Sequence, residues 1–140
     1  MTKALLQCFQ IVTSYFERAK YFASRGMYDR AEQDLVFAST ETLIDSTKMY
    51  QIFHKLAQVQ LKMKKRRESI ASLIHARKHL VTANVSSSDR IKFDIVLKDS
   101  ITKISKRISE SKLLDTSETE LLSEETTKYI PDDFTPHQGK

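Results

Sequence analysis

The chain has 140 residues, of which 40% are hydrophobic and 29% are charged, so a single soluble globular domain with a real core is expected. Only two glycines and two prolines are present, and this scarcity of turn formers excludes a many-stranded β fold and the glycine-rich loops that bind nucleotide phosphates. The net charge of +5 divides into a basic body, residues 1–114, and an acidic tail, residues 115–140, in which seven acidic residues outnumber Lys128 and Lys140.

About five helices are expected in the body, and the first two form the best-defined pair. Apolar residues recur every three or four positions over residues 3–25, and Gly26 is suited to end that helix because glycine readily adopts a positive φ. The inward stripe of this first helix comprises Leu5, Leu6, Phe9, Val12, Phe16, Ala19 and Ala23. A second helix is predicted over residues 28–43, with an inward set of Ala31, Leu35, Ala38 and either Phe37 or Leu43.

The other three helices are predicted over residues 46–63, 66–84 and 89–114. Asp45 and Ser46 offer N-cap oxygens for the third helix, and the SSSD run that ends at Asp89 gives a similar signal for the fifth. The first half of the fifth helix is apolar on several sides, with Ile91, Phe93, Ile95, Val96 and Leu97. Its second half narrows to one stripe, formed by Leu97, Ile101, Ile104 and Ile108. Such a helix is expected to cap the end of a helical stack.

The tail is rich in serine, threonine and glutamate, and it is expected to be disordered because too little apolar surface is present to offset the entropy of ordering. Its spaced apolar residues are the exception that could dock: Leu121, Leu122, Tyr129, Ile130 and Phe134. Two roles are open. The tail could lie in a basic groove of the same chain until a partner competes. Alternatively it is a partner's ligand, with phosphorylation sites among Ser117, Thr119, Ser123, Thr126 and Thr127.

A short pattern occurs twice in the body, 38 residues apart. The residues Tyr15, Ala19, Ala31, Leu35 and Ala38 return as Phe53, Ala57, Ser69, Leu73 and Ala76. Small residues at the same offsets predict the same close crossing of helices in both pairs, so we infer an internal duplication.

This pattern resembles the tetratricopeptide repeat (TPR) family. The first copy matches the family with Tyr15, Ala19, Phe22, Gly26, Tyr28, Ala31, Leu35 and Ala38, although Arg18 stands at the leucine position. The second copy keeps Leu56, but Gln60, Lys64 and Arg66 replace its second aromatic, hinge glycine and tyrosine. Neither copy has the closing proline, and the spacing exceeds the family's usual length of about 34 residues. The resemblance covers residues 12–85 and implies antiparallel helical hairpins stacked as a short right-handed array. A generic antiparallel helical bundle is the alternative.

In this family the first helix of each pair lines a concave groove that binds extended peptides, and the resemblance implies the same here. The groove positions would be Thr13, Phe16, Glu17, Lys20, Gln51, His54, Lys55, Gln58 and Lys62. An aromatic, several amides and a cationic bias suit an acidic peptide or a C-terminal carboxylate. The paired asparagines of chaperone-binding members are missing, since Asn84 is the only asparagine in the chain, so that role is disfavoured. A solvated helix face without a ligand is the plain alternative.

Five cations in six residues form a second candidate surface, made of Lys62, Lys64, Lys65, Arg66 and Arg67. Such a cluster suits nuclear import, nucleic-acid phosphates or anionic lipid. No aromatic residues are interleaved, so base-specific or single-strand recognition is not expected. The alternative is an exposed, solubilising turn.

Reaction chemistry is not expected, and neither is a cofactor, a metal or a small-molecule substrate. His75 and His79 lie four residues apart, but Ala76 stands where zinc peptidases carry a glutamate and no third ligand is apparent. Cys8 beside Phe9 is interpreted as a buried thiol. No apolar run reaches the roughly 18 residues of a membrane span, and the features of a signal peptide are missing, so a cytoplasmic or nuclear protein is expected.

Three functions remain open. The leading one is a non-enzymatic adaptor or scaffold that binds another protein, as a peptide or a partner subunit, through the groove. The second is an electrostatic binder of nucleic acid or anionic membrane that uses residues 62–67. The third is a structural subunit, or a homo-oligomer, that docks through the stripe from Leu97 to Ile108.

Overall fold

The computed structural model describes residues 3–113 and Ile130, and the rest of the predicted acidic tail lies outside the described residues. Five α-helices are present: α1 (Lys3–Ser24), α2 (Tyr28–Ser39), α3 (Ser46–Lys62), α4 (Arg66–Leu80) and α5 (Ser87–Leu113). No strand occurs within these described residues, so the prediction of an all-α fold with about five helices is confirmed.

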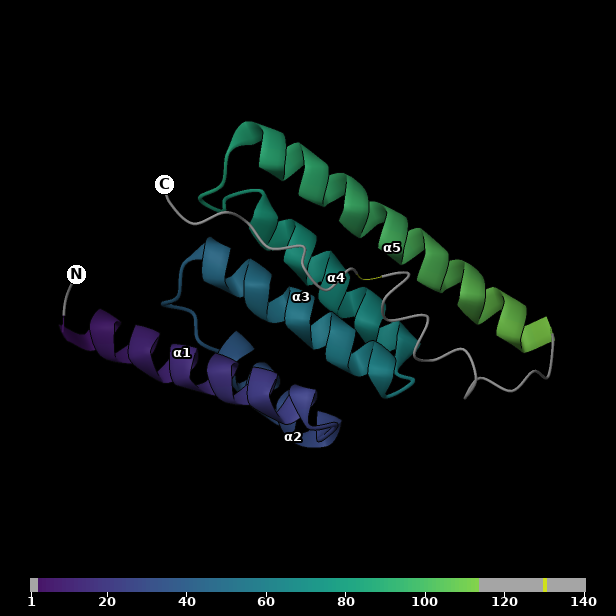
Figure 1. Cartoon of the computed structure of the whole chain (residues 1–140). Coiled ribbons are helices and arrows are strands. Elements are labelled where there is room, and N and C mark those ends of the chain that lie inside the picture. The colour runs from purple at the N-terminus through teal and green to yellow at the C-terminus, as the bar shows by residue number, and fades with distance from the viewer. Residues whose placement is uncertain (1–2, 114–129, 131–140) are drawn as a thin grey trace.

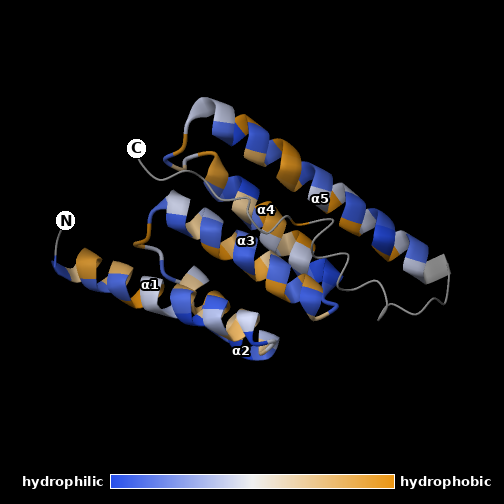
Figure 2. Ribbon diagram, in the orientation of Figure 1, coloured by the Kyte–Doolittle hydropathy of each residue, from blue (hydrophilic) through white to orange (hydrophobic). Residues whose placement is uncertain are grey.

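The helices pack mainly in chain order, each against the next (Figure 1). Short turns join α1 to α2 and α3 to α4, so each of these pairs forms an antiparallel hairpin, and α5 lies along α4 at the side of the molecule far from α1. Figure 2 shows apolar and polar residues alternating around the helices, which is the pattern of amphipathic helices that bury one face. Because α3 lies between the two neighbouring layers, it has buried residues on several sides.

The turns of the two hairpins have the same backbone geometry. Gly26 and Lys64, 38 residues apart, both have positive φ, at 77° and 65°. In the first turn the N–H of Met27 donates to the Phe22 carbonyl at 2.9 Å, and in the second the N–H of Lys65 donates to the Gln60 carbonyl, also at 2.9 Å. This is the hydrogen-bond pattern of a helix that ends at a left-handed residue. The second turn therefore keeps the first turn's conformation without its glycine.

The small residues at the matched offsets are buried in both hairpins. Ala19, Ala31, Leu35 and Ala38 are fully buried in the first hairpin, and Ala57, Ser69, Leu73 and Ala76 are fully buried in the second. The Ser69 hydroxyl donates to the Ala57 carbonyl at 3.0 Å, which satisfies the one polar side chain in this set. Small side chains at these positions let the two helices of each hairpin come close together.

Two core clusters hold the helices together. The first core cluster joins α1, α2 and one side of α3, and its members include Val12, Phe16, Leu35, Ile52 and Leu56. The second core cluster joins α3, α4 and α5 with Ile130, and its members include Tyr50, Leu73, Phe93, Leu97, Ile104 and Ile130. Phe53 packs against both clusters and connects them.

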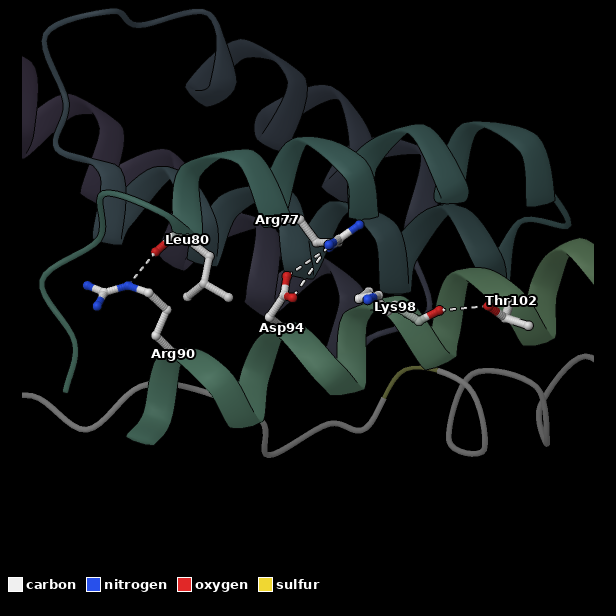
Figure 3. Close-up of polar contacts among 6 residues, drawn as sticks. All are labelled: Arg77, Leu80, Arg90, Asp94, Lys98 and Thr102. Carbon is white, nitrogen blue, oxygen red and sulfur yellow. Dashed lines mark hydrogen bonds and ion pairs between the residues drawn. The ribbon is translucent and has the colours of Figure 1, made fainter. Parts of the chain in front are cut away.

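Polar contacts fix α5 on α4. The Arg77 guanidinium of α4 donates to the Asp94 carboxylate of α5, with an Nε–Oδ1 distance of 2.8 Å (Figure 3). Arg90 near the start of α5 donates to the carbonyls of Leu80 at 3.2 Å and Ala83 at 2.6 Å. Arg90 thus satisfies acceptors at the end of α4 that have no partner within the helix. The Ser86 hydroxyl accepts from the Asp89 N–H at 3.1 Å, so the predicted cap of the fifth helix is present.

Three expectations about the ends and faces of helices are wrong. α2 ends at Ser39 rather than at residue 43, so Phe37 and Leu43 are 51% and 54% exposed instead of inward. The N-terminal half of α1 extends past the shorter α2, which leaves Leu6 and Phe9 exposed. Ile91 and Ile95 are 63% and 60% exposed, because among the described residues α4 supplies the main helix contact of α5 and covers only one of its sides.

Two smaller differences concern helix boundaries. α4 ends at Leu80 rather than near residue 84, and α5 begins at Ser87 rather than at residue 89. Asp45 does occupy the N-cap position of α3 in an extended conformation, but its side chain makes no capping hydrogen bond. The start of α3 therefore depends on packing more than on a side-chain cap.

Candidate peptide-binding groove

A pocket of about 240 Å³ lies between α1 and α3, beside the start of α2. Its lining residues are Lys20, Ala23, Ser24, Tyr28, Lys55, Gln58, Val59 and Lys62. The pocket is lined by the last turns of α1, the start of α2 and the second half of α3. Four of the predicted groove residues, Lys20, Lys55, Gln58 and Lys62, come together here. We call this the lysine pocket.

The lysine pocket has a positive electrostatic character, since three lysines and no carboxylate line it. Lys20 also pairs with Glu17 on the exposed face of α1, at 3.1 Å. The pocket lining thus presents the ammonium groups of Lys20, Lys55 and Lys62 and no acidic side chain. Charge-assisted hydrogen bonds from ammonium groups to carboxylates are about twice as strong as neutral ones, which favours an anionic ligand at this place.

Lys48 extends the positive face along α3, although it is not among the groove residues predicted from the sequence. Its ammonium lies 4.9 Å from the centroid of the Phe16 ring, while Lys20 lies 5.0 Å from the same ring. Burial lowers the pKa of Lys48; the nearby Glu17 carboxylate raises it and the charge of Lys20 lowers it. The signal was available in the sequence, because Lys48, Lys55 and Lys62 are spaced by seven residues and so lie on one face of a helix.

Among the remaining predicted groove residues Glu17 is exposed, and the other four are less exposed than a ligand-binding role suggests. Phe16 belongs to the first core cluster, while Thr13 and Gln51 are half-buried. His54 is only 4% exposed and stacks on Tyr50 with 5.9 Å between ring centroids. Burial, and next the charge of Lys55, lowers the pKa of His54 to about 4, so its imidazole is neutral at pH 7. His54 is therefore part of the core and adds no charge to the groove.

Gln58 connects the lysine pocket to Ile130. Its side chain lines the pocket, and its Nε2 donates to the Ile130 carbonyl with an N–O distance of 3.5 Å. Ile130 is 1% exposed and belongs to the second core cluster. Of the tail residues that were expected to dock, Ile130 is thus in the core, and Leu121, Leu122, Tyr129 and Phe134 lie outside the described residues.

The predicted basic cluster at residues 62–67 does not form one continuous surface. Lys62 lines the lysine pocket, and the Lys65 Nζ lies 2.7 Å from the Glu32 carboxylate of α2, whose hydrogen bond raises the pKa of Lys65. Arg66 is 6% exposed, and Lys64 and Arg67 are the members of the exposed class. The cluster spans the end of α3, a turn and the start of α4.

The stripe from Leu97 to Ile108 is used inside the chain. Leu97 and Ile104 are buried in the second core cluster, and Ile101 and Ile108 pack against it. The stripe was expected either to pack on the other helices of the chain or to bind a partner. In the structure it packs on the other helices, so α5 forms the last layer of the stack.

The two histidines of α4 pack on an aromatic ring. His75 and His79 stack on Phe53, with centroid distances of 4.8 Å and 5.6 Å. Within the described residues, no group of three or more metal-ligating side chains is found. Cys8 is a free thiol and is half-buried rather than fully buried. Packing accounts for the positions of both histidines.

None of the described helices is both long enough and apolar enough to span a bilayer. No family model, no curated protein and no solved structure matches the chain.

Proposed function

We propose that this chain is a non-enzymatic adaptor of the cytoplasm or nucleus. Its two hairpins and α5 form a TPR-like array whose groove binds an acidic peptide or a partner subunit. The array is supported by the repeated turn geometry at Gly26 and Lys64 and by the burial of the same small residues in both hairpins. The short apolar core of each hairpin is completed by its neighbours, as helical repeats require.

The observation that carries the proposed binding function is the composition of the lysine pocket. Residues of α1 and α3 that lie far apart in the sequence bring three ammonium groups to one concavity without a carboxylate in its lining. Gln58, Tyr28 and Ser24 add an amide and two hydroxyl groups to the lining, and the Gln58 amide donates to the Ile130 carbonyl. This combination suits the carboxylates and backbone of an extended acidic peptide, with the ammonium groups supplying attraction and the amide supplying orientation.

The alternative functions have weaker support. Binding of nucleic acid or anionic membrane through residues 62–67 needs a dense, exposed cationic surface, but Arg66 is buried and Lys65 is paired with Glu32. Docking through the stripe of α5 needs an exposed stripe, but Leu97 and Ile104 are already buried within the chain.

The proposal is tested by titrating the full chain with a fluorescein-labelled decapeptide rich in aspartate and glutamate, and following its anisotropy. A matched peptide with asparagine and glutamine at the same positions serves as the neutral control. Lys62→Gln should weaken binding of the acidic peptide about fivefold, because it removes a pocket charge. Lys92→Gln makes the same charge change on the exposed surface of α5 and should have little effect. Equal affinities for the acidic and neutral peptides would reject the proposal.

A further inference from the structure

Ile130 is buried although it lies 17 residues beyond the end of α5. It shares the second core cluster with aromatic rings of α3 and α5, Tyr50 and Phe93, and with aliphatic side chains of α5, Leu97 and Ile104. Its carbonyl accepts a hydrogen bond from Gln58 on α3. One aliphatic side chain in an apolar socket, with its backbone held by an amide, is the geometry by which a groove holds an anchor residue of a peptide.

The energetics allow this contact to exchange. The gain from burying one isoleucine side chain is of the same size as the entropic cost of closing a loop of this length. Ile130 can therefore occupy its socket without being held there irreversibly. A peptide from another molecule can therefore displace Ile130 when the local concentration of that peptide is high enough.

The socket and the lysine pocket are adjacent, because Gln58 contributes to both. Consecutive Cα atoms are about 3.8 Å apart, so a peptide that places an isoleucine in the socket carries the residues two and three positions later to within about 11 Å of it. In this chain those two positions are Asp132 and Asp133. The stretch of sequence that supplies the aliphatic anchor thus also contains two acidic residues.

We propose that the socket of Ile130 and the lysine pocket form one binding site for an extended peptide with an aliphatic residue followed, two and three positions later, by acidic residues. The chain's own Ile130 segment is the resident ligand, and a partner protein binds by presenting the same pattern and displacing it. This inference deepens the proposed function and depends on it. It specifies the ligand as an acidic peptide with an aliphatic anchor. It also implies that the groove is open to a partner only when the Ile130 segment has left it.

The test uses the full chain and a fluorescein-labelled peptide with the sequence of residues 126–136, TTKYIPDDFTP. Wild-type protein should bind this probe weakly, since the resident segment competes. Ile130→Ala should bind it about twofold more tightly, since a resident segment that is bound about half the time halves the apparent affinity, and a probe with alanine in place of the isoleucine should lose that gain. Ile95→Ala, on the exposed side of α5, is the matched control and should behave as wild type.

A second variant keeps the test decisive if Ile130→Ala unfolds, which circular dichroism would reveal. Asp132→Asn combined with Asp133→Asn leaves the isoleucine in place and should also increase binding of the probe, with the larger effect at low salt. Equal affinity of wild type and a folded variant for the probe would overturn the inference. If the acidic decapeptide still binds and depends on Lys62 in that case, the proposed function stands without it. If neither peptide binds any variant, both are rejected.

Discussion

Gly26 and Lys64 occupy equivalent positions in the turns of the two hairpins and share a left-handed backbone conformation, with φ of 77° and 65°. The residues that follow them, Met27 and Lys65, also have nearly identical dihedral angles, with φ of −91° and −92° and ψ of 66° and 67°. The second turn therefore has the same left-handed backbone conformation as the first, although Lys64 stands there in place of glycine. A lysine in this region is strained by about 1 kcal/mol relative to glycine.

Replacing Lys64 by glycine should stabilise the protein by about 0.5–1 kcal/mol, because the left-handed strain is removed. The matched change is Gly26→Ala, which should destabilise by a similar amount. A Cβ at Gly26 would have no atom within 4 Å, so its cost would come from the backbone conformation alone. Both values follow from urea denaturation. A destabilising Lys64→Gly would mean that the side chain of Lys64 contributes more than its backbone costs.

Gln60 stands where the family pattern has an aromatic residue, and its polar contacts explain the difference. Its Nε2 donates to the Glu32 carboxylate at 3.2 Å, and its Oε1 accepts from the Ser72 hydroxyl at 2.6 Å. Gln60→Phe should therefore destabilise the chain by about 2 kcal/mol, although it restores the pattern, because the buried Ser72 loses its partner. Ser72→Ala should cost less, since it leaves no unpaired hydroxyl. Thermal unfolding of the two variants compares them; greater stability of Gln60→Phe would contradict this account.

His54 should make the protein sensitive to mild acid. Its pKa is about 4 in the folded chain, against an ordinary value of 6.5, so the unfolded chain binds a proton over that interval and the folded chain does not. The stabilisation is complete above pH 6.5 and is lost as the pH falls towards 4, by a total of about 3 kcal/mol. His54→Gln should flatten this part of the curve of unfolding free energy against pH. A curve with the same slope in wild type and His54→Gln would refute the assignment.

α5 should contribute to stability through one side only. Ile104 is fully buried, and its change to alanine should cost about 3 kcal/mol. Ile95 is 60% exposed, and the same change there should alter the unfolding free energy by less than about 0.5 kcal/mol. Guanidinium denaturation gives both values. A large loss at Ile95 would indicate that another surface covers it in solution.

Much of the helical architecture could be predicted from the sequence, because the signals are local. The bounds of α3 agree with the prediction to within one residue, and the turn at Gly26 has the expected form. The end of α2 could not be predicted from periodicity, since no glycine or proline marks it. There the hydroxyls of Ser39 and Thr40 each donate to a carbonyl three residues earlier, at 2.7 Å, in the last turn of the helix.

From the sequence, residues could be assigned to the candidate site only where their spacing places them on the same face of a helix. The resemblance to a repeat placed Lys20, Lys55, Gln58 and Lys62 on one groove, and they do line one pocket. The burial of His54 and Arg66 was not predictable, because it depends on what packs over each side chain from elsewhere in the chain. The contact between Gln58 and Ile130 joins residues 72 positions apart, which no local pattern indicates.

The most direct test of the central claim is to map where an acidic peptide binds. The full chain, labelled with ¹⁵N, is titrated with the unlabelled acidic decapeptide, and amide chemical shifts are followed by NMR. We predict that the largest changes occur at residues 20–28 of α1 and α2 and at residues 55–62 of α3, with little change around Ile91 and Ile95. Changes centred on Lys64 and Arg67, or no changes at all at saturating peptide, would contradict the account.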